Sequence, residues 1–344
     1  MTPKTQVMSK TIKILSIDGG GTRGLFPATM LECLEKETGK KIPELFDVIV
    51  GSATGGIIAT ALAAGMDAKD IADVYLHRAK YILPRTWFRG VWNVLNIFAP
   101  KYRNTNLKTL LEAKFAETKT LGQIDAKLLE KKGKAPVFLF PTLELNPKLP
   151  DGQMKAFKVV VYNNREAQYA EEPLVDVALK TSAAMMNLPI YNGFVEGGNY
   201  ANDPALVALF YALGKVENGG LGADLADVKI LSLGCGTDEK SFISSKEIGK
   251  GNWGMARWVN HLAPMVIETK MAATQYYLNQ VFAKDQYLRI NVNYKSPNAP
   301  RPLQKEKKLA IDVREDKLLR AISEYAHLTY QAESQNIKNF IGQP

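Results

Sequence analysis

The sequence predicts an α/β protein with a mostly parallel, doubly wound central sheet. Two short apolar runs, at 13–17 and 46–50, are typical of buried strands, and each leads through small residues into a segment with helical apolar spacing, at 25–37 and 57–64. Repeated alternation of strand and helix is typical of parallel sheets covered by helices on both faces. Because ligands of such sheets bind beyond the carboxyl ends of the strands, the turns after the first two strands are where a site is expected.

The rest of the chain continues with the same kinds of element. Helices are predicted at 68–79, 107–115, 175–184, 205–216, from 253 to about 282, and at 316–330, and strands at 137–143, 155–162 and 228–233. No internal repeat, low-complexity tract or linker separates these segments. At 344 residues and 46% hydrophobic composition, the chain is long enough for one sizeable core. We therefore expect a single domain over residues 11–340, after a polar tail at 1–10.

The composition of the chain limits the cellular locations and the binding partners that we expect. No run of about 18 apolar residues is present to span a membrane, and no secretory signal is expected at the N-terminus. Cys33 and Cys235 are expected to be free, which favours a reducing, cytoplasmic location. The net charge of +9 suits nucleic acid or anionic lipid headgroups, but no nucleic-acid-binding motif accompanies it, so no nucleic acid partner is expected. No residue cluster has metal-ligand spacing, and no metal site is expected.

The turn after the second strand has the form of a nucleophile elbow. It reads Gly-Ser-Ala-Thr-Gly, and its spacing matches G-x-S-x-G, in which Gly51 and Gly55 flank a sharp turn that holds the central side chain above the sheet. In serine acyl hydrolases the central residue carries the attacking oxygen. Here that residue is Ala53, and a methyl group cannot attack a carbonyl. Ser52 and Thr54 carry hydroxyls, but each flanks the apex and is expected to point away from the oxyanion hole.

The turn after the first strand is a run of glycines. Gly19, Gly20 and Gly21 precede Arg23 in a segment that satisfies G-x-G-x-x-G, the pattern of a dinucleotide-binding turn. That function needs an acidic residue at the end of the second strand, where this chain has the elbow. Successive glycines leave backbone N–H groups free to converge on a developing oxyanion, and Arg23 adds positive charge. An oxyanion hole is therefore the preferred interpretation; a tight turn without a ligand is the alternative.

A catalytic base is expected among the carboxylates rather than the histidines. His77, His261 and His327 each lie in a predicted helical segment, where surface or packing roles are expected. Glu196 differs, because it emerges from an apolar run and is followed at once by two glycines, which permit close approach of another backbone. We predict Glu196 as the base; the alternative is an ordinary solvated glutamate in a loop.

Together these segments resemble the patatin-like phospholipase family of lipid acyl hydrolases, over about residues 12–335. Residues 18–24 resemble the family's glycine-rich oxyanion motif, and residues 51–55 resemble its G-x-S-x-G motif. Residues 196–198 are similar to its Asp-Gly-Gly or Asp-Gly-Ala, and residues 201–204 are similar to the Ala-Asn-Asn-Pro that follows. Segments 181–184 and 231–237 also resemble family segments. The resemblance implies a three-layer α/β/α fold and a Ser–Asp dyad that works without histidine. It also implies an acyl-lipid substrate, such as a phospholipid, and no cofactor.

The sequence departs from the family at both members of the dyad. Ala53 stands where the family has serine, and Glu196, one methylene longer, stands where it has aspartate. Loss of the nucleophile costs on the order of 10⁶ in turnover at a comparable serine protease site. The resemblance thus implies a lipid acyl hydrolase by lineage that is inactive as written. The alternatives are a non-catalytic lipid-binding or scaffolding member of the fold, and a nucleotide-binding regulator that uses residues 19–24.

One further segment suggests contact with lipid. Residues 80–98 interleave aromatic and aliphatic side chains with basic ones, and Trp87, Phe88 and Trp92 are the candidates to face lipid. Such a mixture suits a flap on a membrane interface, with tryptophan at headgroup depth and cations near the phosphates. A cap whose apolar side is simply buried is the alternative. The expected location is cytoplasmic with peripheral membrane contact, and the oligomeric state is left open.

Overall fold

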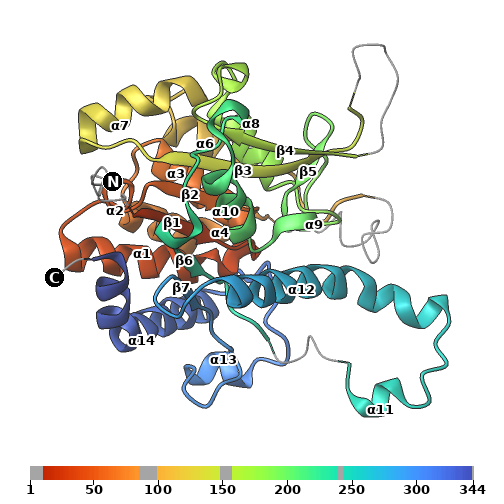
Figure 1. The fold of residues 1–344 in the computed structure, drawn as a ribbon. Coiled ribbons are helices and arrows are strands. Elements are labelled where there is room, and N and C mark those ends of the chain that lie inside the picture. The colour runs from red at the N-terminus through yellow and green to blue at the C-terminus, as the bar shows by residue number, and fades with distance from the viewer. Residues whose placement is uncertain (1–10, 85–98, 148–156, 239–242, 343–344) are drawn as a thin grey trace, which may run out of the picture.

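The computed structural model describes residues 11–84, 99–147, 157–238 and 243–342. Within them the centre of the fold is a seven-stranded sheet (Figure 1). Its strands are β1 (Ile12–Ile17), β2 (Val48–Gly51), β3 (Val137–Glu144), β4 (Lys158–Asn163), β5 (Phe194–Glu196), β6 (Val228–Leu233) and β7 (Tyr287–Ile290). The order across the sheet is β4-β3-β2-β1-β6-β7, and β5 also pairs with β3.

The sheet is mostly parallel, as predicted. Strands β1, β2, β3, β6 and β7 run in the same direction, whereas β4 and β5 are both antiparallel to β3. The pairing of β2 with β3 ends at Val50 opposite Leu139, and β5 pairs with β3 farther along, from Thr142 to Glu144. The short strand β5 therefore brings Glu196 to the carboxyl side of β2.

Helices surround the sheet and supply most of the remaining structure. The longer ones are α1 (Leu25–Thr38), α3 (Thr54–Ala63), α4 (Ala68–Ile82), α6 (Thr105–Lys114), α7 (Ile124–Lys132), α8 (Leu174–Thr181), α10 (Ala205–Leu213), α12 (Met255–Val281) and α14 (Asp316–Ile341). The short ones are α2 (Ile42–Leu45), α9 (Gly198–Ala201), α11 (Ser245–Ile248) and α13 (Arg301–Lys305), with 3₁₀ turns at Gly21–Gly24, Leu121–Gln123, Ala167–Tyr169, Val216–Asn218 and Leu225–Asp227. No helix within the described ranges is both long and apolar enough to span a bilayer.

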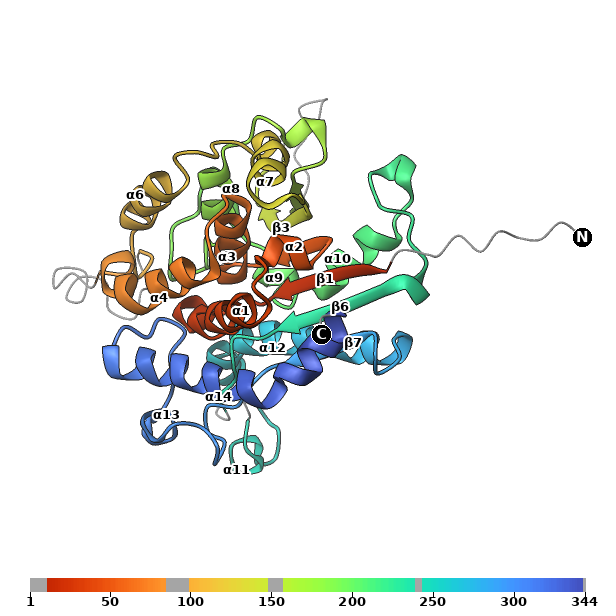
Figure 2. The ribbon, with the colours of Figure 1, turned by 90° about the vertical axis from the view of Figure 1, so that its left-hand side faces the viewer.

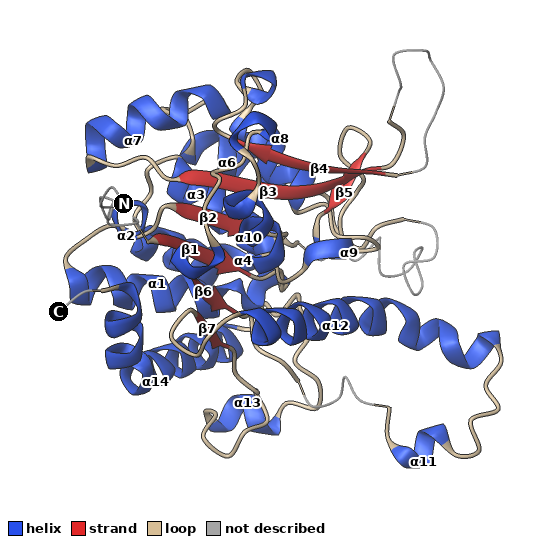
Figure 3. Ribbon diagram, in the orientation of Figure 1, coloured by secondary structure: helices blue, strands red, loops and turns tan. Residues whose placement is uncertain are grey.

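Alternate residues of the central strands point to opposite faces and form two separate cores. Leu15 and Ile17 of β1 pack with α1, α3, α4, α8 and α14, whereas Ile14 of β1 and Val48 of β2 pack with α10 and with Leu278 of α12. Figures 2 and 3 show these helix layers on the two sides of the sheet. The arrangement is the three-layer α/β/α fold, and it explains why the central strands read as continuous apolar runs.

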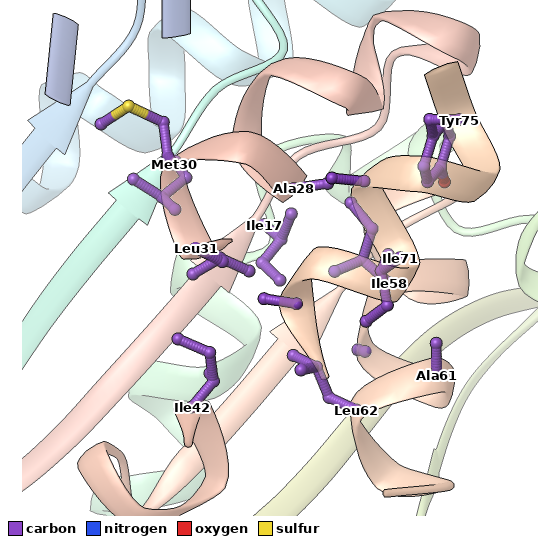
Figure 4. Packing of buried hydrophobic residues seen from close by; sticks show 14 of the residues in the cluster. Ile17, Ala28, Met30, Leu31, Ile42, Ile58, Ala61, Leu62, Ile71 and Tyr75 are labelled. Carbon is purple, nitrogen blue, oxygen red and sulfur yellow. The ribbon is translucent and has the colours of Figure 1, made fainter. Parts of the chain in front are cut away.

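The larger core fixes the position of the two turns that follow β1 and β2. Figure 4 shows Ile17 of β1 between Leu31 of α1 and Ile58 of α3. All three side chains are buried, with at most 1% of their surface exposed. Because α1 and α3 pack on the same strand, the turns that lead into them lie side by side at the carboxyl edge of the sheet.

Several elements differ from the sequence-based expectations. The helix expected at 205–216 ends at Leu213, and the helix expected at 316–330 continues to Ile341. Part of the strand expected at 155–162 lies outside the described residues, and β4 begins at Lys158. Strands β5 and β7 were not predicted, because β5 has only three residues and the apolar pattern of β7 is interrupted by Arg289. Both cysteines are free, as expected.

Candidate active site

The turn between β2 and α3 has the strained geometry of an elbow. Ala53, at its apex, has φ 50° and ψ −116°, a combination that non-glycine residues rarely adopt and that costs roughly 1–3 kcal/mol. The flanking glycines have no room for a side chain. A Cβ added to Gly51 would lie 2.1 Å from the carbonyl oxygen of Gly55, and one added to Gly55 would lie 2.1 Å from the carbonyl oxygen of Ile17. The geometry is thus kept although the apex residue is alanine.

The glycine-rich loop after β1 lies against this elbow. A Cβ added to Gly19 would lie 3.1 Å from the Ala53 Cβ and 2.3 Å from the Asn202 Oδ1, so glycine lets the loop pack tightly between the elbow and Asn202. Asn202 holds the loop from the other side. The Gly19 N–H donates to the Asn202 carbonyl oxygen at 3.0 Å, and the Asn202 side-chain amide donates to the Gly19 carbonyl oxygen at 3.2 Å. Gly19 is thereby fixed between the elbow and the segment that follows β5.

The next residues of the loop carry free backbone donors. The Thr22 N–H donates to the Ile311 carbonyl oxygen at 2.7 Å. Between Gly19 and Thr22, the N–H groups of Gly20 and Gly21 have no hydrogen-bond acceptor within the described part of the chain. Gly21 has φ 61°, in the left-handed region that favours glycine. Two adjacent backbone donors thus remain available to a ligand.

Glu196 is the last residue of β5 and is fixed through its backbone. It lies opposite Thr142 of β3, and its N–H donates to the Ala183 carbonyl oxygen at 3.1 Å. Burial raises the pKa of the Glu196 carboxyl to about 7, although a hydrogen bond from the Met185 backbone opposes this increase. Near neutral pH the carboxyl is therefore poised between its protonated and ionised forms, the condition in which a side chain can accept and return a proton.

The predicted residues meet in one cavity. It measures about 1340 Å³, open mouth included, and its wall contains Gly19, Gly20, Gly21, Arg23, Ala53 and Glu196. Gly51 and Gly55 shape the elbow behind this wall. Most of the remaining wall is apolar, with side chains from α3, α4, α6 and the segment after α8: Ile57, Val74, Ile82, Leu107, Leu111 and Leu188. The arrangement combines a largely apolar chamber with the Glu196 carboxyl group and two free backbone donors.

The two hydroxyls beside the apex behave differently from each other. Ser52 is fully buried, lies outside the cavity wall and has no partner for its Oγ within the described residues, as expected for a side chain directed away from the site. Thr54, which was also expected to point away from the oxyanion hole, lines the cavity. Its Oγ1 lies 2.5 Å from the hydroxyl of Tyr75 in α4, so the hydroxyl is engaged by a neighbouring helix.

A buried ion-pair network holds the residue that precedes the glycine loop. Asp18 has no exposed surface and accepts two hydrogen bonds from Arg289 of β7, at 2.8 Å and 2.5 Å. The Arg289 guanidinium also lies 3.6 Å from the carboxylate of Asp203. Burial lowers the pKa of Arg289, but the two carboxylates outweigh this effect and raise it above its usual range. Burial raises the pKa of the Asp18 carboxyl to about 7 although Arg289 opposes this increase, and the two short hydrogen bonds from Arg289 fix the residue from which the loop starts.

Comparison with known proteins identifies this architecture. The family model of the patatin-like phospholipase matches residues 15–209, more than half of the chain, and spans the glycine-rich loop, the elbow and Glu196. The chain belongs to the patatin-like phospholipase family. The sequence-based recognition of this family is confirmed.

Individual relatives of this patatin-like chain come from plants and bacteria. Patatin-like protein 2 of Arabidopsis thaliana is 29% identical over 84% of this chain and 78% of its own. The cGAMP-activated phospholipase of Vibrio cholerae serotype O1 is also 29% identical, over 74% of this chain and 73% of its own. Among solved structures, VipD from Legionella pneumophila covers 94% of this chain and 70% of its own at 12% identity, but its TM-score of 0.39 is too low to support any conclusion.

Several side chains of the patatin-like site were not singled out from the sequence. Asn202 and Cys235 lie in segments that resemble the family, and this resemblance was the only signal for them. Asp312 also lines the cavity; it accepts a hydrogen bond from the Tyr102 hydroxyl at 2.6 Å and pairs with Lys101. No sequence pattern connects these residues to the elbow, since they come from distant parts of the chain.

Other predicted residues fall outside this site. His77 and His327 are exposed, and neither they nor His261 contribute to the cavity wall. The lipid-facing candidates Trp87, Phe88 and Trp92 lie outside the described residues.

Proposed function

We propose that this chain is a lipid acyl hydrolase by architecture and that Ala53 leaves it without the nucleophile. The observation that supports this most directly is the strained backbone of Ala53. The turn holds an inert methyl group against the Gly19 loop, in the same cavity as the Glu196 carboxyl. Backbone strain of this kind persists at sites where the position of one side chain is important for function. A methyl group carries no reactive atom whose position could matter, so the strain is better explained by a site built for a reactive side chain.

The reaction follows from the same groups once serine occupies position 53. Glu196 takes the serine proton as the oxygen attacks the ester carbonyl, and the N–H groups of Gly20 and Gly21 stabilise the oxyanion, with Arg23 nearby. Collapse of this intermediate breaks the ester bond, and Glu196 returns its proton to the leaving alcohol. Water, deprotonated by Glu196, then releases the fatty acid from the serine.

The chain as written lacks this pathway. Removal of the nucleophile from a comparable serine protease site costs on the order of 10⁶ in turnover, and the remaining groups retain roughly 10³ to 10⁴ over water. Neither neighbouring hydroxyl offers a substitute. Ser52 lies outside the cavity, and the Thr54 hydroxyl contacts Tyr75. We therefore propose that the present sequence hydrolyses esters at most very slowly.

The substrate class proposed is the acyl ester of a membrane lipid. The apolar cavity wall suits a fatty acyl chain, and the family supports a lipid substrate. Trp87, Phe88 and Trp92 remain the proposed lipid-facing residues of a flap, and the proposed setting is cytoplasmic, at a membrane surface. The proposed domain extends from residue 11 to 340, beyond the family match, because β6 and β7 belong to the same sheet as β1.

An ester hydrolysis assay tests this proposal. Release of p-nitrophenol from a p-nitrophenyl acyl ester is measured for the chain itself, for Ala53→Ser, and for Ala53→Ser combined with Glu196→Asp or Glu196→Gln. Ala53→Ser is expected to gain activity that rises through about pH 7, because Glu196 must be ionised to accept a proton. The Gln combination is expected to lose that gain. If neither serine variant exceeds the starting chain, the proposal is wrong.

A non-catalytic lipid binder is the second candidate, and the open cavity favours it. Alanine at position 53 removes the reactive oxygen while the apolar wall remains in place. The matching experiment measures binding of a fluorescent fatty acid to the unmodified chain, with Leu111→Glu in the cavity wall as the blocked control. Saturable binding that the substitution abolishes, together with inactive serine variants, would favour this candidate over a hydrolase.

Nucleotide regulation is a third candidate, supported only by similarity. The Vibrio cholerae relative is named a cGAMP-activated phospholipase and is 29% identical to this chain. We propose cGAMP as the nucleotide to test, by its effect on the unfolding temperature of the chain and on ester hydrolysis by Ala53→Ser. The absence of both effects would exclude cGAMP as a regulator of this chain.

A further inference from the structure

A long arm extends from the fold without packing on it. The arm, defined here as residues 244–266, consists of α11, a connecting loop and the first turns of α12. Figures 1 and 3 show α12 running out from the body of the protein with α11 beyond its N-terminal end. Among the described residues from 243 to 273, none is buried, and from 244 to 259 all but Trp253 are exposed. The protein thus presents a helix that its own core does not stabilise.

One side of this helix is apolar. Its exposed residues, with the fraction of surface exposed, are Met255 (78%), Trp258 (38%), Val259 (57%), Leu262 (42%), Met265 (38%) and Val266 (43%). Spacings of three and four residues place these side chains on a single face of the helix. Exposed patches of this kind mark contact sites, since soluble monomers seldom leave contiguous apolar surface in water. The arm therefore needs something to cover it.

The chemistry of the arm matches an anionic lipid surface. Trp253 and Trp258 form an edge-to-face pair with ring centroids 5.2 Å apart, and the Arg257 guanidinium lies 5.0 Å from the Trp253 ring. Lys246 and Lys250 are both exposed. Tryptophan prefers the headgroup depth of a bilayer, and Lys or Arg beside it interacts with the phosphates.

The charge of the arm distinguishes a membrane from a second copy of the chain. The arm carries three Lys or Arg residues and one carboxylate, Glu247. A second arm would bring the same positive charge to the contact, whereas an anionic bilayer brings the opposite charge. The net charge of the whole chain, +9, acts in the same direction.

The arm is also continuous with the wall of the cavity. Ile267, Glu268 and Met271 follow it directly on α12, and all three line the cavity that contains Ala53 and Glu196. At a rise of about 1.5 Å per residue, Trp258 lies only about 15 Å along the helix axis from Glu268. A lipid surface that covers the arm would therefore lie close to the cavity.

We propose that the arm docks the protein on anionic membranes and holds the cavity close to the lipid. The purpose of this docking, which is to bring lipid acyl chains to the cavity, rests on the proposed function. The docking itself requires no catalysis and involves residues separate from the flap at 80–98. Docking can therefore be tested on the chain as it is.

The experiment uses the two tryptophans of the arm as reporters. The chain has four tryptophans, so Trp87→Phe with Trp92→Phe leaves only Trp253 and Trp258. Phosphatidylcholine vesicles with phosphatidylglycerol are expected to shift the emission to the blue and to float the protein, and added salt is expected to weaken both effects. Vesicles of phosphatidylcholine alone are expected to give little of either.

Substitutions separate the arm from the rest of the surface. Val259→Glu with Leu262→Glu places two carboxylates on the apolar side and is expected to weaken binding to anionic vesicles about tenfold or more. Leu328→Glu with Val216→Glu is the matched control, because it adds the same two carboxylates at positions outside the arm that are 47% and 72% exposed. The control is expected to bind as the unmodified chain does.

The outcomes distinguish docking from catalysis. In the Ala53→Ser background, the arm variant is expected to retain hydrolysis of a soluble ester and to lose hydrolysis of vesicle lipid. If serine variants hydrolyse no ester while flotation still depends on the arm, the proposed function fails and docking stands. If the arm variant floats as well as the control, docking is overturned. It is also overturned if the chain is a dimer that the arm variant dissociates and no vesicles are bound.

Discussion

Glu196→Gln offers a direct test of the environment of the carboxyl group, because it concerns stability rather than activity. Unfolded, this carboxyl ionises with a pKa of about 4.5, whereas burial raises the pKa in the folded protein to about 7. Between these values the unfolded chain has lost the proton that the folded protein keeps. The stability contributed by the neutral form is therefore present below about pH 4.5 and is lost as the pH rises through about 7.

The size of this effect follows from the same two pKa values. Once the group is fully ionised, the loss amounts to roughly 3 kcal/mol in the free energy of unfolding, an upper value because Glu196 is only partly buried. Glutamine has similar shape and cannot ionise. The variant is thus expected to gain stability relative to the parent as the pH increases from about 4.5 to 8.

Urea denaturation at several pH values measures the difference. The midpoint for Glu196→Gln minus that for the parent is expected to increase with pH up to about 7 and then to level off, at an unchanged slope of free energy against urea. Glu130→Gln, at an exposed position of α7, is the control for loss of a negative charge. A difference that stays constant over this range, or that decreases as the pH rises, would refute the buried state of the carboxyl.

Two further predictions concern the structure beneath the site. Arg289→Met leaves the buried carboxyl groups of Asp18 and Asp203 without their cation and is expected to lower the free energy of unfolding, measured by urea denaturation, by about 3–5 kcal/mol. Arg289→Lys keeps the positive charge and is expected to lower it less. Equal stability of the Met variant and the parent would contradict a structural role for the network. Gly55→Ala places a Cβ 2.1 Å from the rigid carbonyl oxygen of Ile17 and is expected to cost about 1–3 kcal/mol or more in the same measurement. Gly254→Ala, where a Cβ meets nothing within 4 Å and φ is −91°, is the control for adding a Cβ without a clash.

The sequence was sufficient to predict strands β1, β2, β3 and β6 of the sheet and the turns that follow β1 and β2. Buried parallel strands must be apolar on both faces, and the turns that follow them need glycine where backbones approach closely. Both the strands and the turns can therefore be recognised from residues that are adjacent in the sequence. The same local logic indicated Glu196, an acid that breaks an apolar run before two glycines. Strands β5 and β7 were missed, because a three-residue strand and an edge strand containing Arg289 have no recognisable period of their own.

By itself, then, the sequence determined most of the longer strands and helices and the two sharp turns, and it showed that the apex of the elbow lacks an oxygen. Only the tertiary structure decided that Gly19, Ala53 and Glu196 share one cavity, and that Asn202 fastens the loop from nearly two hundred residues away. It also decided that the first half of α12 leaves the core. The physical reason is sequence separation. Patterns of neighbouring residues determine the local backbone conformation, whereas contacts between distant segments depend on how the helices pack on both faces of the sheet.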